Sequence, residues 1–233
     1  MEPQTAGGQQ RQIFCYNRDL AIAVAKKAKA GGVGQFIYLS SMAVFGLAEG
    51  AITANTKVLP RVADYYGRSK YEAEEALASL LMTGQVKPHS SALCIVRPPM
   101  VYGPGCPGKF ATLVKVAKKT PVIPKVNNRR SMIFIDNLCE FLCLAVEERI
   151  SGVFHPHNKE YMNTTWLIKA VAEAMGKRRL VIPGFGWVIR LAMPFSAAVK
   201  TAFGSLYYDN NMAAMPHGGD YQMVSAEESI KSL

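Results

Sequence analysis

The chain has 233 residues, of which 49% are hydrophobic, and a formal net charge of +10 at pH 7. This length and apolar content are sufficient to bury the core of one domain, or of one domain with an added lobe. The basic residues are dispersed and do not form a continuous stripe with interleaved aromatic residues, so the charge does not indicate a nucleic-acid-binding protein.

Three features argue against a secreted or membrane-spanning protein. The first 20 residues contain no apolar run of the length found in signal peptides. The most apolar stretch, Leu180 to Val199, contains Arg190, Pro183 and Pro194, so we predict a helical lid or core segment there. The five cysteines include no C-x-x-C pair, which indicates reduced thiols rather than a disulfide framework. We therefore expect a cytoplasmic protein.

The chain begins with a polar stretch that lacks a hydrophobic period, so we expect residues 1–15 to be disordered. The first predicted helix is Arg18 to Ala30, an Ala-rich run that is apolar on one face and basic on the other. It ends at Gly31-Gly32, which is a helix stop signal. Gln35 to Leu39 is rich in aromatic and β-branched residues and predicts a buried strand that ends at Ser40-Ser41.

The next predicted helix carries two residues of catalytic interest and continues to about Met82. Tyr66 and Lys70 lie one helical turn apart and therefore share a face. A neighbouring ammonium makes the phenol anion easier to form, so Tyr66 is a candidate base. Ser41, at the end of the preceding strand, is placed to hold and orient the same substrate hydroxyl. A tyrosine and a lysine at this spacing also occur on solvated helix faces, so the interpretation depends on the surrounding elements.

A second buried strand is predicted at Ala92 to Val96 and leads into Arg97-Pro98-Pro99. The succession of helix, strand, helix and strand is typical of a doubly wound α/β sheet. In such sheets ligands bind beyond the carboxyl ends of the strands, where Ser40, Ser41 and Arg97-Pro98-Pro99 fall. The sequence therefore predicts a partial, Rossmann-like parallel sheet with a smaller C-terminal lobe.

Two later motifs imitate binding sites. Gly103 to Gly108 spells G-x-G-x-x-G, but Pro104 and Pro107 remove backbone donors from a loop that would have to donate them to a phosphate. We predict a turn there, followed by a helix whose first residue, Lys109, can meet a substrate phosphate. His155-Pro156-His157 has no third ligand at a suitable spacing, so no metal site is predicted.

The C-terminal half contains further helices. Cys139 and Cys143 lie four residues apart on one of them, and we interpret both as core thiols. Asn163 or Thr164 can cap a later helix, which Gly176 ends.

Four sequence blocks resemble, in the same order, those of one enzyme family: FIYLSSMAVFG, YYGRSKYEAEEAL, IVRPPMVYGPG and RSMIFIDNL. They look like the extended short-chain dehydrogenases, the NAD-dependent epimerase/dehydratase family typified by UDP-glucose 4-epimerase. The resemblance spans about Tyr16 to Ile230, because FGSLYYDNNM and GDYQMVSAEESI are similar to the C-terminal segment of that family.

The resemblance implies roles for individual residues. Tyr66 would be the base, Lys70 would hold the nicotinamide ribose, and Ser41 would align the substrate. Further positions that the family places at its NAD cofactor are Asn17, Ser40 and Pro99. Arg130 matches the arginine that pairs with the pyrophosphate of a nucleotide-sugar, and Lys109 joins it on the substrate side.

Four features depart from the family pattern. His217 stands where many sugar-nucleotide epimerases have a second pyrophosphate arginine, and Phe45 stands where the family often has tyrosine. Met42-Ala43 follow Ser41 where family dehydratases carry an acid pair, so oxidation and re-reduction of a ring carbon fits better than dehydration. The Gly-rich turn that holds the cofactor pyrophosphate is absent near the start. A shortened protein, a misassigned start and a fragment all agree with that absence.

The implied organisation is a partial NAD(P)-binding region at residues 16–101, rejoined by residues 131–148. A substrate-binding lobe would comprise residues 102–130 and 149–233. NADP stays open beside NAD, because the residue that distinguishes them belongs to the missing segment.

The expected function is that of an NAD(P)-dependent sugar-nucleotide epimerase in which Tyr66 abstracts a proton. A reductase of steroid-like ketones from the same superfamily is an alternative, and so is a non-catalytic remnant that acts through a partner. The expected binding partners are a nucleotide-sugar and, through the Tyr66 helix, a second copy in a homodimer. Neither nucleic acid nor a membrane is expected as a partner.

Overall fold

The computed structural model describes residues 6–61, 64–82, 92–184 and 203–232, together with positions 186, 191, 195 and 200. The chain divides into two units. Unit 1 comprises Met1–Gly46, Thr56–Pro98 and Leu142–His155, and unit 2 comprises Leu47–Asn55, Pro99–Phe141 and Pro156–Leu233. The predicted span Leu180 to Val199 lies largely outside the described residues. Among the described helices, none is long and apolar enough to cross a bilayer.

Unit 1 is built on a parallel sheet with the strand order β1-β3-β7. Strands β1 (Gln35–Leu39) and β3 (Ala92–Val96) have the predicted bounds and pair along their whole length. Strand β7 (Gly152–Phe154) pairs with the second half of β3, with Cys94 opposite Gly152. Both pairings are parallel, which confirms the predicted α/β class with a partial parallel sheet.

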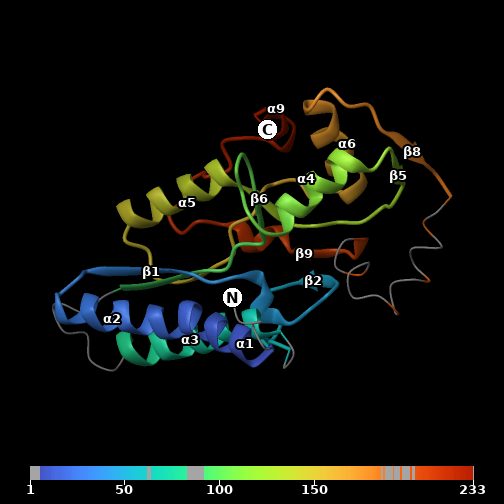
Figure 1. Ribbon diagram of the computed structural model, residues 1–233. Coiled ribbons are helices and arrows are strands. Elements are labelled where there is room, and N and C mark those ends of the chain that lie inside the picture. The colour runs from blue at the N-terminus through green and yellow to red at the C-terminus, as the bar shows by residue number, and fades with distance from the viewer. Residues whose placement is uncertain are drawn as a thin grey trace. The chain divides into compact units, whose positions relative to one another are not determined.

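Helices α1 (Ala6–Phe14), α2 (Leu20–Ala30) and α3 (Tyr65–Leu81) lie on one side of this sheet (Figure 1). A π-helical turn, η1 (Cys15–Asp19), lies between α1 and α2 in the chain. Helices α2 and α3 match their predicted positions. Their apolar faces meet the sheet in a core of Ala25, Tyr38, Ala73, Leu77, Leu81, Leu93 and Ile95.

The start of the chain differs from the expected disordered segment, because Ala6–Phe14 is helical. The contacts of Phe14 give a physical reason. The guanidinium carbons of Arg18 and Arg68 lie 5.0 and 5.7 Å from the centroid of the Phe14 ring. These cation–π contacts attach the end of α1 to η1 and α3, and a local hydrophobic period cannot reveal them.

Within its described residues, unit 2 contains three separate pairs of parallel strands. They are β2 (Gly50–Ile52) with β9 (Leu206–Tyr208), β4 (Met100–Tyr102) with β6 (Met132–Phe134), and β5 (Val122–Pro124) with β8 (Leu180–Ile182). Helices α4 (Lys109–Lys119) and α6 (Thr164–Ala174) pack together, and α9 (Ala226–Lys231) contacts α6 (Figure 1). Short 3-10 turns lie at Met42–Phe45 (η2, in unit 1) and Asn210–Ala213 (η3, in unit 2).

Helix α5 (Ile135–Glu147) crosses the division between the units at Phe141 and Leu142. The sequence-based boundaries assigned residues 131–148 to the cofactor-binding sheet. In the structure, β6 pairs with β4 in unit 2, and β7 is the strand that returns to β3. Which sheet a strand joins depends on its pairing with distant segments, and a short apolar run in the sequence does not encode that pairing.

Two local predictions can be compared with the structure. Asn163 is the cap of α6, since its Oδ1 accepts a hydrogen bond from Trp166 N at 3.1 Å. The interpretation of Cys139 and Cys143 as core thiols is wrong, because both are exposed. Burial instead falls on Cys94 in β3, where desolvation raises the pKa of the thiol to about 11.

Candidate active site

The candidate site in unit 1 begins at the carboxyl end of β1. Ser40 N donates to Val96 O at 2.7 Å, which continues the pairing of β1 with β3 by one residue. The Ser40 side chain is buried, and its hydroxyl has no hydrogen-bond partner within the described part of the chain. Ser41 is extended, and its Oγ accepts from Ala43 N at 3.2 Å, which starts the η2 turn.

Helix α3 supplies the phenol and the ammonium. Its N-terminus is capped by Asp64, whose Oδ1 accepts from Gly67 N at 3.0 Å. Lys70 Nζ donates to Leu39 O at 2.9 Å, so the ammonium lies at the end of β1. The same nitrogen lies 5.9 Å from the ring centroid of Tyr66 and 5.1 Å from that of Tyr38. The end of β1 and the first turns of α3 thus bring Ser41, Tyr66 and Lys70 into one region.

Opposing influences act on the Tyr66 phenol. Burial raises its pKa most, a hydrogen bond with Ser41 lowers it, and the Asp64 carboxylate raises it. Burial also lowers the pKa of Lys70, while the negative charge of Glu74 raises it. Together these influences raise the Tyr66 pKa above its usual value, and the opposing influence comes from Ser41, whereas the sequence analysis expected Lys70 to lower the pKa.

Asn17, which lies in η1, is tied to the same strand. Tyr38 Oη donates to the backbone oxygen of Asn17 at 3.0 Å. Burial, followed by the charge of Glu74, raises the Tyr38 pKa, so the neutral phenol is a stable hydrogen-bond donor. Tyr38 therefore connects the Asn17 turn with the strand that ends at Ser40.

The remaining candidate residues belong to unit 2. Pro99 is buried and begins the second segment of the unit, and Lys109 is the first residue of α4. Arg130 bridges to Met162 and Leu206, and its Nη1 donates to Gly204 O at 3.1 Å. Burial lowers the Arg130 pKa. The exposed His217 has a φ of +58° and lies in the same unit.

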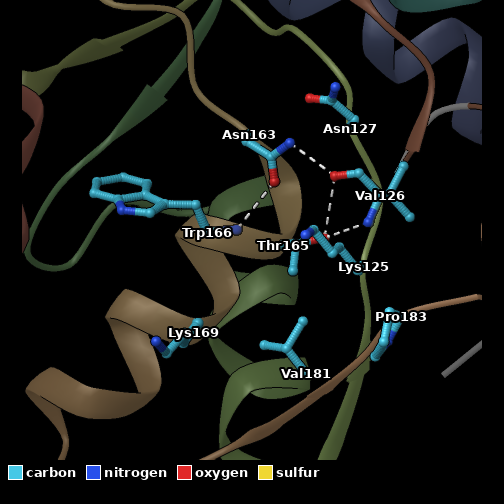
Figure 2. A pocket seen from close by; sticks show the side chains of 9 residues that line it. All are labelled: Lys125, Val126, Asn127, Asn163, Thr165, Trp166, Lys169, Val181 and Pro183. Carbon is cyan, nitrogen blue, oxygen red and sulfur yellow. Dashed lines mark hydrogen bonds between the residues drawn. The ribbon is translucent and has the colours of Figure 1, made fainter.

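Unit 2 also contains a cavity of about 700 Å³ between the segment after β5, helix α6 and strand β8 (Figure 2). Val126, Val181 and Pro183 contribute apolar surface, and Lys125 and Lys169 contribute charge. Its other lining residues are Asn127, Asn163, Thr165 and Trp166. The Asn163 amide donates to Val126 O at 2.7 Å, so it holds together two segments that line the cavity.

The sequence analysis did not single out Glu74, and it placed Arg97 at the ligand-binding end of a strand without predicting what it contacts. Glu74 follows Lys70 by one turn of α3, and Arg97 follows β3. Their side chains form an ion pair in which Arg97 Nη2 lies 2.5 Å from Glu74 Oε2. The spacing of Glu74 from Lys70 was visible in the sequence, but the contact with Arg97 depends on how α3 packs near the end of β3.

Sequence comparisons assign the chain to a family. The chain is 31% identical over 178 residues to the UDP-glucose 4-epimerase of Vibrio cholerae, a match that covers 73% of this chain and 52% of that protein. It is 28% identical over 170 residues to the ceramide reductase of Caulobacter vibrioides, covering 71% and 46% of the two chains. The chain thus spans about half the length of these curated relatives.

The fold resembles the solved UDP-glucuronic acid 4-epimerase of Bacillus cereus, which was crystallised with NAD. The TM-score is 0.67 at 18% identity, over 93% of this chain and 65% of that one. At this identity the likeness describes the fold. The model of the NAD dependent epimerase/dehydratase family matches residues 6–157, which is more than half of the sequence. The chain therefore belongs to the NAD dependent epimerase/dehydratase family.

Proposed function

We propose that this chain carries the proton-transfer centre of an NAD(P)-dependent, epimerase-type oxidoreductase that acts on a nucleotide-sugar. The observation that carries the proposal is the position of the Lys70 ammonium, which lies 2.9 Å from Leu39 O at the end of β1, just before Ser40 and Ser41, and 5.9 Å from the centroid of the Tyr66 ring. A serine hydroxyl, a phenol and an ammonium gathered at one strand end form the set of groups that proton abstraction from a substrate hydroxyl needs.

The residues at the end of β1 fit a dinucleotide cofactor. Ser40 offers a buried hydroxyl without a partner among the described residues. Lys70 offers an ammonium, which donates to Leu39 O at the end of the same strand. These groups, with the Asn17 turn, would hold the ribose and nicotinamide parts. When bound, the cofactor supplies reversible hydride acceptance.

The side chains of this chain perform the acid–base work. Ser41 orients the reacting hydroxyl and donates to the developing phenolate of Tyr66. The Lys70 ammonium stabilises that anion by its charge. On the substrate side, the cations Arg130 and Lys109 of unit 2 would neutralise a pyrophosphate.

A reductase of a hydrophobic ketone is a second candidate function. The identity to the ceramide reductase of Caulobacter vibrioides favours it. The same Ser41 and Tyr66 arrangement would then deliver a proton to a carbonyl oxygen instead of removing one from a hydroxyl. The two candidates differ in substrate polarity and share the proton-transfer groups.

The decisive experiment measures NAD⁺ and NADP⁺ binding to the full chain by calorimetry, followed by turnover of UDP-glucose and of a long-chain ketone. We expect cofactor binding and sugar-nucleotide turnover, and a loss of about 10²-fold or more in turnover for Tyr66→Phe, which lacks the acid–base hydroxyl. Tyr65→Phe removes the adjacent hydroxyl and is the matched control, which should keep its activity.

Turnover of the ketone alone would favour the reductase. Absence of cofactor binding and of both activities would contradict the catalytic proposal and favour a non-catalytic protein that acts through a partner. Equal losses for Tyr65→Phe and Tyr66→Phe would argue against Tyr66 as the proton-transfer group.

A further inference from the structure

Helix α3 and the segment after β3 are joined by a buried ion pair. Arg97 Nε and Nη2 lie 3.0 and 2.5 Å from the two carboxylate oxygens of Glu74. Only 11% of the Arg97 side chain and 4% of the Glu74 side chain are exposed. A two-pronged contact of this kind fixes the plane of the guanidinium as well as its position. In a buried ion pair, the cost of desolvation offsets much of the attraction between the charges. The main effect we consider for this pair is therefore the orientation that it gives to the Arg97 side chain.

The same guanidinium packs on the turn that carries Ser41. Its central carbon lies 5.3 Å from the ring centroid of Phe45, the last residue of η2. Phe45 is buried, and its ring lies 5.8 Å from that of His155. At the other end of the turn, Met42 N donates to Pro98 O at 3.0 Å. Arg97 and Pro98 therefore contact both ends of η2.

Helix α3 also approaches this turn directly. A Cβ atom on Gly67 would lie 2.7 Å from Ala43 O, which is too close for any side chain. Glu74 lies two turns after Tyr66 on the same helix. The contacts thus form a closed path from α3 through Glu74, Arg97 and Phe45 to the turn, and from the turn back to α3 at Gly67.

We propose that Glu74 and Arg97 are positioning residues, which hold the Ser41 turn against helix α3 so that the Ser41 hydroxyl meets the Tyr66 phenol. Their contribution to catalysis rests on the proposed function. The packing of the Ser41 turn against α3 involves residues of unit 1 alone. Both residues act through other side chains: Arg97 through Phe45 and the turn, and Glu74 through Arg97.

The contact can be followed by NMR titration of the full chain with ¹³C-labelled tyrosine, in which Tyr66→Phe identifies the Tyr66 signal. The Ser41 hydroxyl is the group that lowers the Tyr66 pKa, so we expect Ser41→Ala to raise this pKa. In a double-mutant cycle, the same substitution should raise it by less than half as much in a Glu74→Gln or an Arg97→Lys background. Loss of coupling would show that the pair places Ser41, which a merely stabilising role would not require.

Phe45→Leu keeps an apolar side chain but removes the ring beneath the guanidinium, and it should weaken the coupling in the same way. If Glu74→Gln does not fold, the variants Phe45→Leu and Arg97→Lys together test whether the pair places Ser41. Glu173→Gln is the matched control, because it breaks the exposed ion pair with Lys169 on α6 and should leave the coupling unchanged.

An equal effect of Ser41→Ala in every background would overturn the proposal, as would no effect in the wild-type chain. The titration requires no cofactor or substrate. Intact coupling without NAD(P)-dependent turnover would therefore contradict the proposed function while leaving the positioning role in place.

Discussion

The Glu74 and Arg97 side chains neutralise one another at a place where water has little access. Removing either side chain should therefore lower the free energy of unfolding. We expect Glu74→Ala to lower the free energy of unfolding by about 3–5 kcal/mol, because it leaves the Arg97 charge buried without its carboxylate. Urea unfolding followed by circular dichroism measures the change.

The exposed pair between Lys169 and Glu173 provides the comparison at the same scale. Its nitrogen and oxygen lie 3.6 Å apart, and about half of each side chain is exposed. Solvent screening limits such a pair to about 0.3–0.5 kcal/mol, so Glu173→Ala should have little effect. Similar losses for Glu74→Ala and Glu173→Ala would contradict the assignment of Glu74 to a desolvated pair.

At the scale of elements, helix α3 reverses the usual rule for glycine in a helix. Replacing a helical glycine with alanine normally stabilises by about 0.5–1 kcal/mol. At Gly67 the new Cβ would lie 2.7 Å from Ala43 O and 2.9 Å from Asp64 Oδ2. We expect Gly67→Ala to destabilise the chain by more than about 1 kcal/mol, because the turn or the cap has to move. Thermal unfolding measures this.

Gly31, at the end of α2, is the matched control for Gly67. Its φ is −82°, and a Cβ there would lie 3.4 Å from the nearest atom, Lys27 O. Gly31→Ala should therefore change stability by less than about 0.5 kcal/mol. A Gly67→Ala variant as stable as the wild type would show that α3 does not press on the Ser41 turn.

The elements differ in how much of their structure could be predicted. Strands β1 and β3 have the predicted bounds, and α3 has nearly the predicted length, because local alternation, a capping aspartate and helical spacing specify them. The pairing of β4 with β6 was missed, since it joins short segments about 30 residues apart in the chain.

The candidate site shows the same division. A strand end and a helical spacing were sufficient to nominate Ser41, Tyr66 and Lys70. Neither signal predicts that Arg97 reaches Glu74 on one side and Phe45 on the other, because those contacts depend on tertiary packing. Sequence patterns therefore nominated the groups for chemistry, and the structure identified the groups that orient them.

At the scale of the whole molecule, each unit contains a buried tyrosine with a raised pKa. In unit 1, burial raises the pKa of Tyr38. In unit 2, burial raises the pKa of Tyr221 from 10.0 to about 12, although hydrogen bonds with His157 and Gln222 partly oppose this. Tyr221 is 2% exposed, and its hydroxyl accepts from His157 N at 3.1 Å.

The raised values make stability depend on alkaline pH with a definite sign. Folding favours the neutral phenol, so its contribution is complete below the unfolded pKa of about 10 and declines as pH rises toward the folded value. For Tyr221 the loss between about pH 10 and pH 12 amounts to about 3 kcal/mol, at about 1.4 kcal/mol per pKa unit.

We expect urea unfolding at a series of pH values to show a constant contribution from Tyr221 up to about pH 10 and a decline above it. Tyr221→Phe removes the titrating hydroxyl, so the variant should start less stable at pH 8 but lose less stability between pH 10 and pH 12. Tyr16→Phe, at a tyrosine that is 64% exposed, should follow the wild-type profile. Parallel profiles for the wild type and Tyr221→Phe would mean that the phenol titrates alike in the folded and unfolded chains, which its burial against His157 opposes.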